Sequence, residues 1–241
     1  MINFKLITIF PNILDSYFSQ TILARAQKNK LIKIDYLNLR GFTTDKHKTV
    51  DDKIYGGGAG MLLKIEPIYK ALRALKSKIK NQKLPASTRG AHRREAGKLR
   101  IILLAANGKQ FEQSDAKRLS KYQNLIFICG RYEGVDARVE KFVDEKISIG
   151  PYVLAGGELG AAVMVEAISR LIPGVVGKIA SVQEESFSQK NILEHPHYTR
   201  PELFITKEGK KLRVPKALLS GHHGKIGAWR QVKSKKLTTK P

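Results

Sequence analysis

The sequence has few of the residues that form crosslinks, thiolate metal sites and membrane spans. Cys129 is its only cysteine, so the chain can form no internal disulfide and no cysteine-rich zinc site, which favours a reducing compartment. The apolar run near the start is interrupted by Pro11 and Asn12, well short of the roughly 20 apolar residues of a transmembrane helix. The sequence therefore predicts a cytoplasmic protein without a signal peptide or a membrane partner.

Acidic residues are also scarce. Lys and Arg number 44 against 21 Asp and Glu, and the formal net charge is +23. Much of the excess lies in residues 70–100 and 206–241, each with eleven basic residues and one acidic residue. Such charge predicts a polyanionic partner, because Lys and Arg displace counterions from phosphates. A ribosomal protein or a membrane-surface protein can carry the same charge.

Apolar runs alternate with amphipathic patterns over most of the chain. The runs typical of buried strands are Phe4–Phe10, Leu31–Leu39, Leu99–Ala106, Asn124–Gly130 and Glu145–Gly150. The patterns typical of helices lie near Ile13–Asn29, Glu66–Lys80, Gln113–Lys121, Asp136–Val143 and Gly157–Leu171. Strands that alternate with helices predict an α/β fold with a parallel sheet.

Glycines follow three of the predicted strands, in "AANGK", "CGRYEG" and "SIGPYVLAGGE". Because ligands of open α/β sheets bind outside the carboxyl ends of the strands, these loops predict one ligand pocket. No G-x-G-x-x-G follows the first strand and no G-x-x-x-x-G-K-[ST] occurs, so dinucleotide-binding and P-loop interpretations are weak. A lone glycine run more often marks a tight turn than a site, but three runs at strand ends favour the pocket.

Six ordered blocks carry a more specific signal than any glycine run. They are "DKHKTVDDKIYGGGAGM" (Asp45–Met61), "LIFICGRYEGVDARV" (Leu125–Val139), "SIGPYVLAGGEL" (Ser148–Leu159), "SRLIPGVVGK" (Ser169–Lys178), "HYTRPE" (His197–Glu202) and "LLSGHHGKIGAWR" (Leu218–Arg230). Together they resemble the bacterial tRNA (guanine-N(1)-)-methyltransferase (TrmD) family of the SPOUT class. The resemblance implies methylation of N-1 of guanosine at tRNA position 37, with S-adenosylmethionine as the cofactor.

The same resemblance implies the architecture. The family has an α/β sheet with a deep trefoil knot, a rare exception to unthreaded chains, and a small, mostly helical C-terminal domain. We therefore expect a SPOUT domain over 1–172, a linker with a catalytic loop over 173–190, and a basic, shortened tRNA-binding domain over 191–241. A homodimer and the tRNA anticodon stem-loop are the implied partners, and DNA is not one.

The three glycine loops coincide with the cofactor-binding segments of the family, where backbone groups are expected to hold adenine and ribose. The residues implied to bind the cofactor are Leu103, Leu104, Ala105, Ala106, Asn107, Gly108, Gly130, Tyr132, Glu133, Gly134, Ser148, Ile149, Gly150, Pro151, Tyr152, Val153, Leu154, Gly156 and Gly157. Three positions depart from the family pattern: the first loop reads "AANG" where S-P-x-G is usual, Pro151 stands where an Asp is common, and Gly160 stands where a Pro is common.

Two adjacent acids, Glu184 and Glu185, stand in "ASVQEESFSQ" within an otherwise basic chain. Guanine N-1 carries a proton at neutral pH, so its methylation requires a base within hydrogen-bond reach. The resemblance aligns Glu185 with the catalytic Asp of the family, and it implies that Arg170 stabilises charge on guanine O6. A solvated loop for Glu185 and a helix-end salt bridge for Arg170 are the alternative interpretations.

The histidines show no metal-ligand spacing, and no metal ligand is predicted. His195 and His197 flank a proline, His222 and His223 lie far along the chain, and no H-E-x-x-H occurs. A magnesium requirement is associated with the family, but the sequence identifies no ligands for it. The block around His47 implies that Asp51, Asp52 and Tyr55–Gly58 line the active site, beside the cofactor site of the partner subunit.

Two other functions stay open at the level of the sequence. One is a different SPOUT RNA methyltransferase, against which "GRYEG", "YGGGAGM" and "SGHH" together argue. The other is a non-catalytic RNA-binding protein that kept the fold, which Glu185, Pro151 and "AANG" would support as departures from the family pattern.

Overall fold

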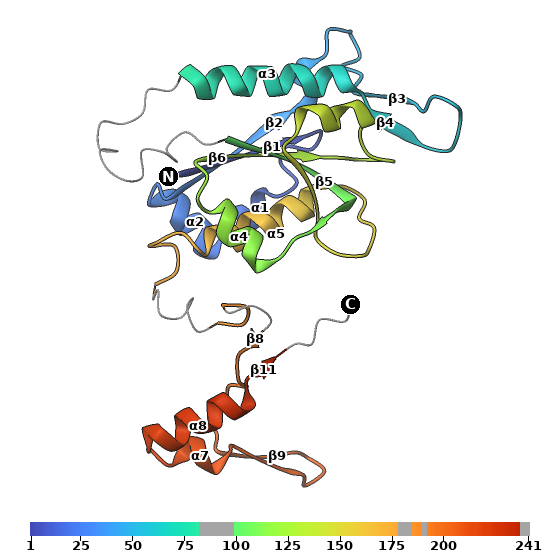
Figure 1. Ribbon diagram of the computed structural model, residues 1–241. Coiled ribbons are helices and arrows are strands. Elements are labelled where there is room, and N and C mark those ends of the chain that lie inside the picture. Colours follow the sequence, from blue (N-terminus) through green and yellow to red (C-terminus); the bar gives the residue numbers. More distant parts are fainter. Residues whose placement is uncertain (82–98, 178–184, 189–191, 237–241) are drawn as a thin grey trace. The chain divides into compact units, whose positions relative to one another are not determined.

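The computed structural model describes residues 1–81, 99–177, 185–188 and 192–236 (Figure 1). The chain divides into two compact units, Met1–Gly177 and Lys178–Pro241, and each unit is described by itself. The division falls within the segment 173–190 that the sequence suggests as a linker.

Five strands form one parallel sheet in the first unit. They are β1 (Ile2–Thr8), β2 (Ile32–Asn38), β5 (Leu99–Gln110), β6 (Asn124–Cys129) and β7 (Glu145–Ser148). Their order across the sheet is β2-β1-β6-β5-β7, and every neighbouring pair is parallel. This sheet confirms the predicted α/β fold, and all five predicted strands are present.

Helices cover both faces of the sheet (Figure 1). One face carries α3 (Ile65–Asn81), and the other carries α1 (Asp15–Phe18), α2 (Thr21–Lys28), α4 (Gln113–Leu119) and α5 (Glu158–Ser169). Because both faces are covered, the central strands are apolar on both sides, as is typical of parallel sheets.

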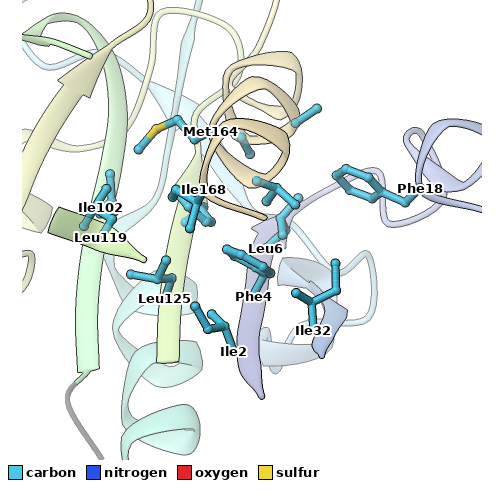
Figure 2. Packing of buried hydrophobic residues seen from close by; sticks show 14 of the residues in the cluster. Ile2, Phe4, Leu6, Phe18, Ile32, Ile102, Leu119, Leu125, Met164 and Ile168 are labelled. Carbon is cyan, nitrogen blue, oxygen red and sulfur yellow. The ribbon is translucent and has the colours of Figure 1, made fainter. Parts of the chain in front are cut away.

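The side chains of β1 illustrate the two layers of the core. Phe4 and Leu6 point to the face of α5, where they join a cluster with Met164 and Ile168 (Figure 2), while Ile7 points to the face of α3. This alternation follows the two-residue period of a strand. All five side chains are at most 1% exposed.

Two predicted helices are wrong in form. The pattern Ile13–Asn29 becomes two short helices, because Gln20 is extended and Thr21 has a φ of +55°. The pattern Asp136–Val143 becomes a 3-10 helix, η3 (Ala137–Phe142), in which Val139 N–H bonds three residues back to Asp136 C=O at 2.9 Å. The Asp136 carboxylate also accepts from Arg138 N–H at 2.9 Å, which favours a tight turn over a full helix.

The strand β5 runs beyond its predicted end at Ala106 and carries a large bulge. Ile147 of β7 pairs with both Leu104 and Lys109 of β5, so residues 105–108 bulge out of the ladder. The first glycine loop is therefore a bulge inside a strand, and the chain continues along β7 after it. The trefoil knot itself stays a prediction.

The second unit contains helices and short strands. Its elements are β8 (Ile192–Leu193), β9 (Leu203–Ile205), β10 (Lys211–Arg213), α7 (Lys216–Leu219), α8 (His223–Lys233) and β11 (Lys235–Lys236). The strands pair antiparallel as β9 with β10 and β8 with β11. The Trp229 ring of α8 packs edge-on against His195 and Tyr198, with centroid distances of 6.2 and 6.1 Å. Within the described ranges, no helix is long and apolar enough to cross a membrane.

Candidate active site

A cavity of about 500 Å³ opens at the carboxyl ends of β5, β6 and β7. The bulge of β5, the loop after β6 and the loop after β7 line it together, as the three glycine loops predict. All residues expected to bind a cofactor line this cavity except Gly108 and Pro151. The three loops, which are distant in sequence, therefore form one concave site.

The two exceptions have different causes. Gly108 faces β7, where a Cβ on it would stand 2.6 Å from Ile147 N, so this glycine permits close backbone packing and does not border the cavity. Pro151 is exposed, in a tight turn in which Tyr152 N–H bonds to Gly150 C=O at 2.9 Å. The turn directs Tyr152 into the lining while Pro151 stays outside it.

Sequence reasoning missed five lining residues. They are Val135, Ala137, Glu140, Ile147 and Gly160. Ile147 and Gly160 directly flank the third loop, and a wider margin around that loop would have included them. Glu140 carries no sequence signal, because only the 3-10 form of η3 brings it to the cavity.

The second and third loops are joined by their backbones. Gly157 N–H donates to Gly130 C=O at 2.9 Å, and a Cβ on Gly157 would lie 2.9 Å from the Cα of Cys129. Only glycine allows this approach without moving backbone atoms. The close contact joins two loops that both line the cavity.

Two carboxylates, those of Glu133 and Glu140, form one wall of the cavity. Glu140 is paired with Lys146 at 2.8 Å, and the Glu133 side chain lies against Gly60, whose Cβ would fall 2.7 Å from Glu133 Oε1. Both carboxylates of this wall are exposed, and Lys146 balances the charge of Glu140, so Glu133 is the group that would attract a positively charged ligand, with the modest strength of a solvent-screened interaction.

The glycine-rich block "YGGGAGM" supports this wall from within the same chain. Its last residue begins β4 (Met61–Leu63), which pairs antiparallel with β3 (Asp51–Lys53). Met61 C=O accepts from Glu133 N–H at 3.1 Å, and Leu63 N–H donates to Gly134 C=O at 3.0 Å. The block thus adjoins the second loop of its own chain, and its place beside the cofactor site of a partner subunit stays a prediction.

The two candidate catalytic residues belong to different units. Arg170 caps the end of α5, where it is half-buried and its N–H bonds to Glu166 C=O at 3.0 Å. Glu185 is half-buried at the start of a turn that Ser188 N–H closes onto Glu185 C=O at 3.0 Å. In that turn, Phe187 has a φ of +64° and donates its N–H to Ile192 C=O at 2.7 Å, which ties the segment to β8. Glu184 lies outside the described residues.

No group of three or more His, Cys, Asp or Glu side chains in the described parts of the chain is arranged to hold a metal ion. The rings of His195 and His197 are tilted by 47° with their centroids 4.7 Å apart, and His197 Nε2 lies 2.9 Å from Glu194 Oε2. That pair lowers the pKa of the Glu194 carboxyl, mainly through the hydrogen bond with His197.

A parallel sheet with a cavity lined by loops at its carboxyl edge is typical of α/β proteins that bind a small molecule there. Comparison with known proteins identifies the family within this class. The tRNA (Guanine-1)-methyltransferase TrmD family model matches residues 2–241. The chain therefore belongs to the TrmD family.

Individual relatives agree with this membership. The tRNA (guanine-N(1)-)-methyltransferase of Dictyoglomus turgidum is 47% identical, over 99% of this chain and 87% of the relative. The protein of the same name from Carboxydothermus hydrogenoformans is 46% identical, over 95% of this chain and 81% of the relative. The crystal structure of tRNA (m1G37) methyltransferase from Aquifex aeolicus superposes with a TM-score of 0.71 at 34% identity, covering 95% and 87% of the two chains.

Proposed function

We propose that this protein is an enzyme that transfers a methyl group from S-adenosylmethionine to N-1 of guanosine at position 37 of tRNA. Membership of the TrmD family supports the reaction. The observation that carries the proposal is the single cavity formed by the β5 bulge and the two glycine loops, which offers the cofactor a site at the carboxyl ends of the strands.

The cavity suits S-adenosylmethionine in size and in charge. Its volume of about 500 Å³ is within the range of sites for small molecules and cofactors. Leu103, Leu104 and Leu154 provide apolar surface, and exposed N–H and C=O groups of the glycine loops can hold adenine and ribose edges. Glu133 places a carboxylate where the cation of the cofactor would be attracted, while Glu140 is already paired with Lys146. When bound, S-adenosylmethionine supplies an electrophilic methyl group.

The residues of this chain would then prepare the guanine. Glu185 is proposed as the base that accepts the N-1 proton, and Arg170 as the cation that stabilises the negative charge that develops on O6. The turn closed by Ser188 and the bond from Phe187 to β8 hold the Glu185 backbone, which would allow its side chain a defined reach. Because the family base is an Asp, the extra methylene of Glu185 requires a slightly more distant backbone.

The second unit is the proposed binding surface for the anticodon stem-loop. Its exposed basic residues, within the described part of this unit, are Arg200, Lys207, Lys210, Lys211, Arg213, Lys216, Lys225, Arg230, Lys233 and Lys235. Tyr198 and Phe204 are 49% and 54% exposed, and aromatic rings of this kind stack on unpaired bases. Phosphate contacts and stacking together suit a single-stranded loop held by its stem.

A homodimer and a cytoplasmic location complete the proposal. Leu159 and Val163 are one turn apart on α5 and remain 59% and 48% exposed. Phe10, at the end of β1, is 45% exposed and contacts Arg131 beside the start of α5. Exposed apolar side chains grouped in this way support burial against a second copy of the chain. Magnesium, which is associated with the family, is assigned no ligand.

The reaction is tested with tRNA transcripts that differ only at position 37. Methyl transfer from labelled S-adenosylmethionine is expected for the transcript with guanosine 37 and not for one with adenosine 37. Binding of both transcripts without transfer would instead indicate the non-catalytic RNA-binding protein. Transfer to a different guanosine would indicate another SPOUT specificity.

The base is tested by Glu185→Gln, with the adjacent Glu184→Gln as the matched control. Loss of a general base typically slows the chemical step by roughly 100-fold or more, and this loss is expected in single-turnover assays of Glu185→Gln. Cofactor affinity should change little, since every residue proposed to bind the cofactor belongs to the first unit and Glu185 belongs to the second. Equal rates for the two variants would remove Glu185 from the mechanism.

A further inference from the structure

We propose that Arg131 and Glu158 are positioning residues, which form a largely buried ion pair that holds the two glycine loops at the separation required for cofactor binding. This role rests on the proposed function. The pair would affect the cofactor indirectly, through the cavity-lining residues that adjoin Arg131 and Glu158 in the sequence.

Glu158 is a buried carboxylate with two partners. The residue is 1% exposed and begins α5 directly after Gly157. Thr8, the last residue of β1, donates its hydroxyl to Glu158 Oε1 at 2.6 Å. Arg131 Nε stands 2.9 Å from Glu158 Oε2. This second contact is an ion pair. Its two atoms are close, but they are not aligned as a hydrogen bond requires.

Arg131 connects the same carboxylate to both loops. Its side chain is 17% exposed, its Nη1 donates to Ala155 C=O at 3.4 Å, and its guanidinium lies 4.8 Å from the centre of the Phe10 ring. Gly156 leaves the room that the guanidinium occupies, since a Cβ there would overlap Arg131 Nε and Cδ. The end of β1, the loop after β6 and the loop after β7 therefore meet at one charged contact.

Neither residue borders the cavity, but the residues beside them do. Gly130 and Tyr132 flank Arg131, and Gly156 and Gly157 precede Glu158; all four line the cavity. A change in the ion pair would shift these lining residues by way of the backbone. The two loops are also joined through the backbone, by an isolated antiparallel bridge between Arg131 and Gly156 that includes the bond from Gly157 N–H to Gly130 C=O. The ion pair adds a buried side-chain contact to that bridge and extends it to Thr8 at the end of β1.

The chemistry of the pair favours positioning over net stabilisation. A buried ion pair contributes little stability compared with apolar side chains of similar size, because both charges lose their hydration. Its geometric demands are strict, however, because the buried charges must stay paired. An ion pair at this place suits a site where the relative placement of two loops matters.

The test compares variants of the pair with a control ion pair in the same unit. Arg131→Gln, Arg131→Lys, Glu158→Gln and the milder Thr8→Val alter the network. Arg118→Gln removes a partly buried ion pair with Glu145, 2.8 Å long, which does not border the cavity. For each full-length protein, calorimetry gives the dissociation constant for S-adenosylmethionine, and filter binding gives that for tRNA. Thermal unfolding is recorded without ligand, and KM and kcat for the cofactor are measured separately.

Arg131→Gln and Glu158→Gln are expected to weaken cofactor binding by about 10- to 100-fold, the scale of a small misplacement of binding groups. KM for the cofactor should rise more than kcat falls, and tRNA affinity should stay unchanged. Arg131→Lys should recover part of the loss, because it keeps the charge. Arg118→Gln should lower the unfolding temperature without changing cofactor affinity.

Two results would overturn the proposal. One is parental cofactor affinity in folded Arg131→Gln, Glu158→Gln and Thr8→Val proteins. The other is a loss of affinity that tracks the unfolding temperature in every variant, Arg118→Gln included, since that pattern belongs to a purely structural role. If Arg131→Gln and Glu158→Gln do not fold, Thr8→Val and Arg131→Lys decide between these outcomes. Failure of the parent protein to bind S-adenosylmethionine would refute the proposed function, and the positioning role with it.

Discussion

Replacing Gly108 by alanine tests how β5 returns to the sheet after its bulge. An added Cβ would lie 2.6, 2.7 and 2.8 Å from the N, C and Cα atoms of Ile147, all of them backbone atoms. Ordinary contact begins at 3.4 Å, so β7 would have to move by about 0.8 Å. No rotamer change can relieve this overlap, because the obstructing atoms belong to the main chain.

The cost follows from the surroundings of Gly108. The displacement would strain the pairs Lys109–Ile147 and Gln110–Ser148 and the 2.8 Å bond from Phe111 N–H to Ser148 C=O. Overpacking of this kind costs about 1–3 kcal/mol in the free energy of unfolding. In a unit of this size, that loss corresponds to a fall of about 2–12 °C in the unfolding temperature. Cofactor affinity should fall as well, because Ile147 and Ser148 line the cavity.

Gly41→Ala is the matched control. No atom lies within 4 Å of a Cβ at Gly41, and its φ is not in the left-handed region, so the change should be neutral or stabilise by a few tenths of a kcal/mol. Calorimetric unfolding of both variants, followed by titration with S-adenosylmethionine, provides the measurement. Equal unfolding temperatures for Gly108→Ala and Gly41→Ala would refute the close approach of β5 to β7.

Two further predictions concern titratable groups of the first unit. Burial by itself raises the pKa of the Glu145 carboxyl, but hydrogen bonds from Arg118 and Arg100 outweigh this effect and leave the pKa lowered. The ionised carboxylate therefore stabilises the folded protein above the ordinary pKa of Glu, and this stabilisation is lost as the pH falls through the lowered pKa. Chemical unfolding between pH 6 and 3 should show a steeper loss for the parent than for Arg118→Gln, and parallel profiles would contradict the assignment. Burial raises the pKa of the Cys129 thiol well above its ordinary value, so a thiol reagent at pH 8 should label the native protein far more slowly than the protein unfolded in guanidinium. Rapid labelling of the native protein would contradict the burial of Cys129 in the core.

The sheet and the cavity could be predicted from the sequence for simple reasons. Each central strand is an apolar run, and the glycines that follow three of them stand where parallel strands present their ends. The bulge in β5 and the 3-10 form of η3 could not be predicted, because both depend on contacts with other segments. Ile147 must pair twice with β5 to create the bulge, and the Asp136 side chain must cap Arg138 N–H to tighten the turn.

The contact between Thr8 and Glu158 could not be predicted from the sequence. Glu158 follows "LAGG", and its position in the sequence is that of an acidic residue in the first turn of a helix. A carboxylate there interacts favourably with the positive end of the helix dipole. Its burial depends on β1 and β6 lying side by side, which brings Thr8 to a carboxylate 150 residues away and places Arg131 opposite the same group. A glycine loop can be recognised from composition, because its backbone conformation or close packing requires glycine. A positioning residue is recognised only after the strands are in register, because its role depends on what it holds in place.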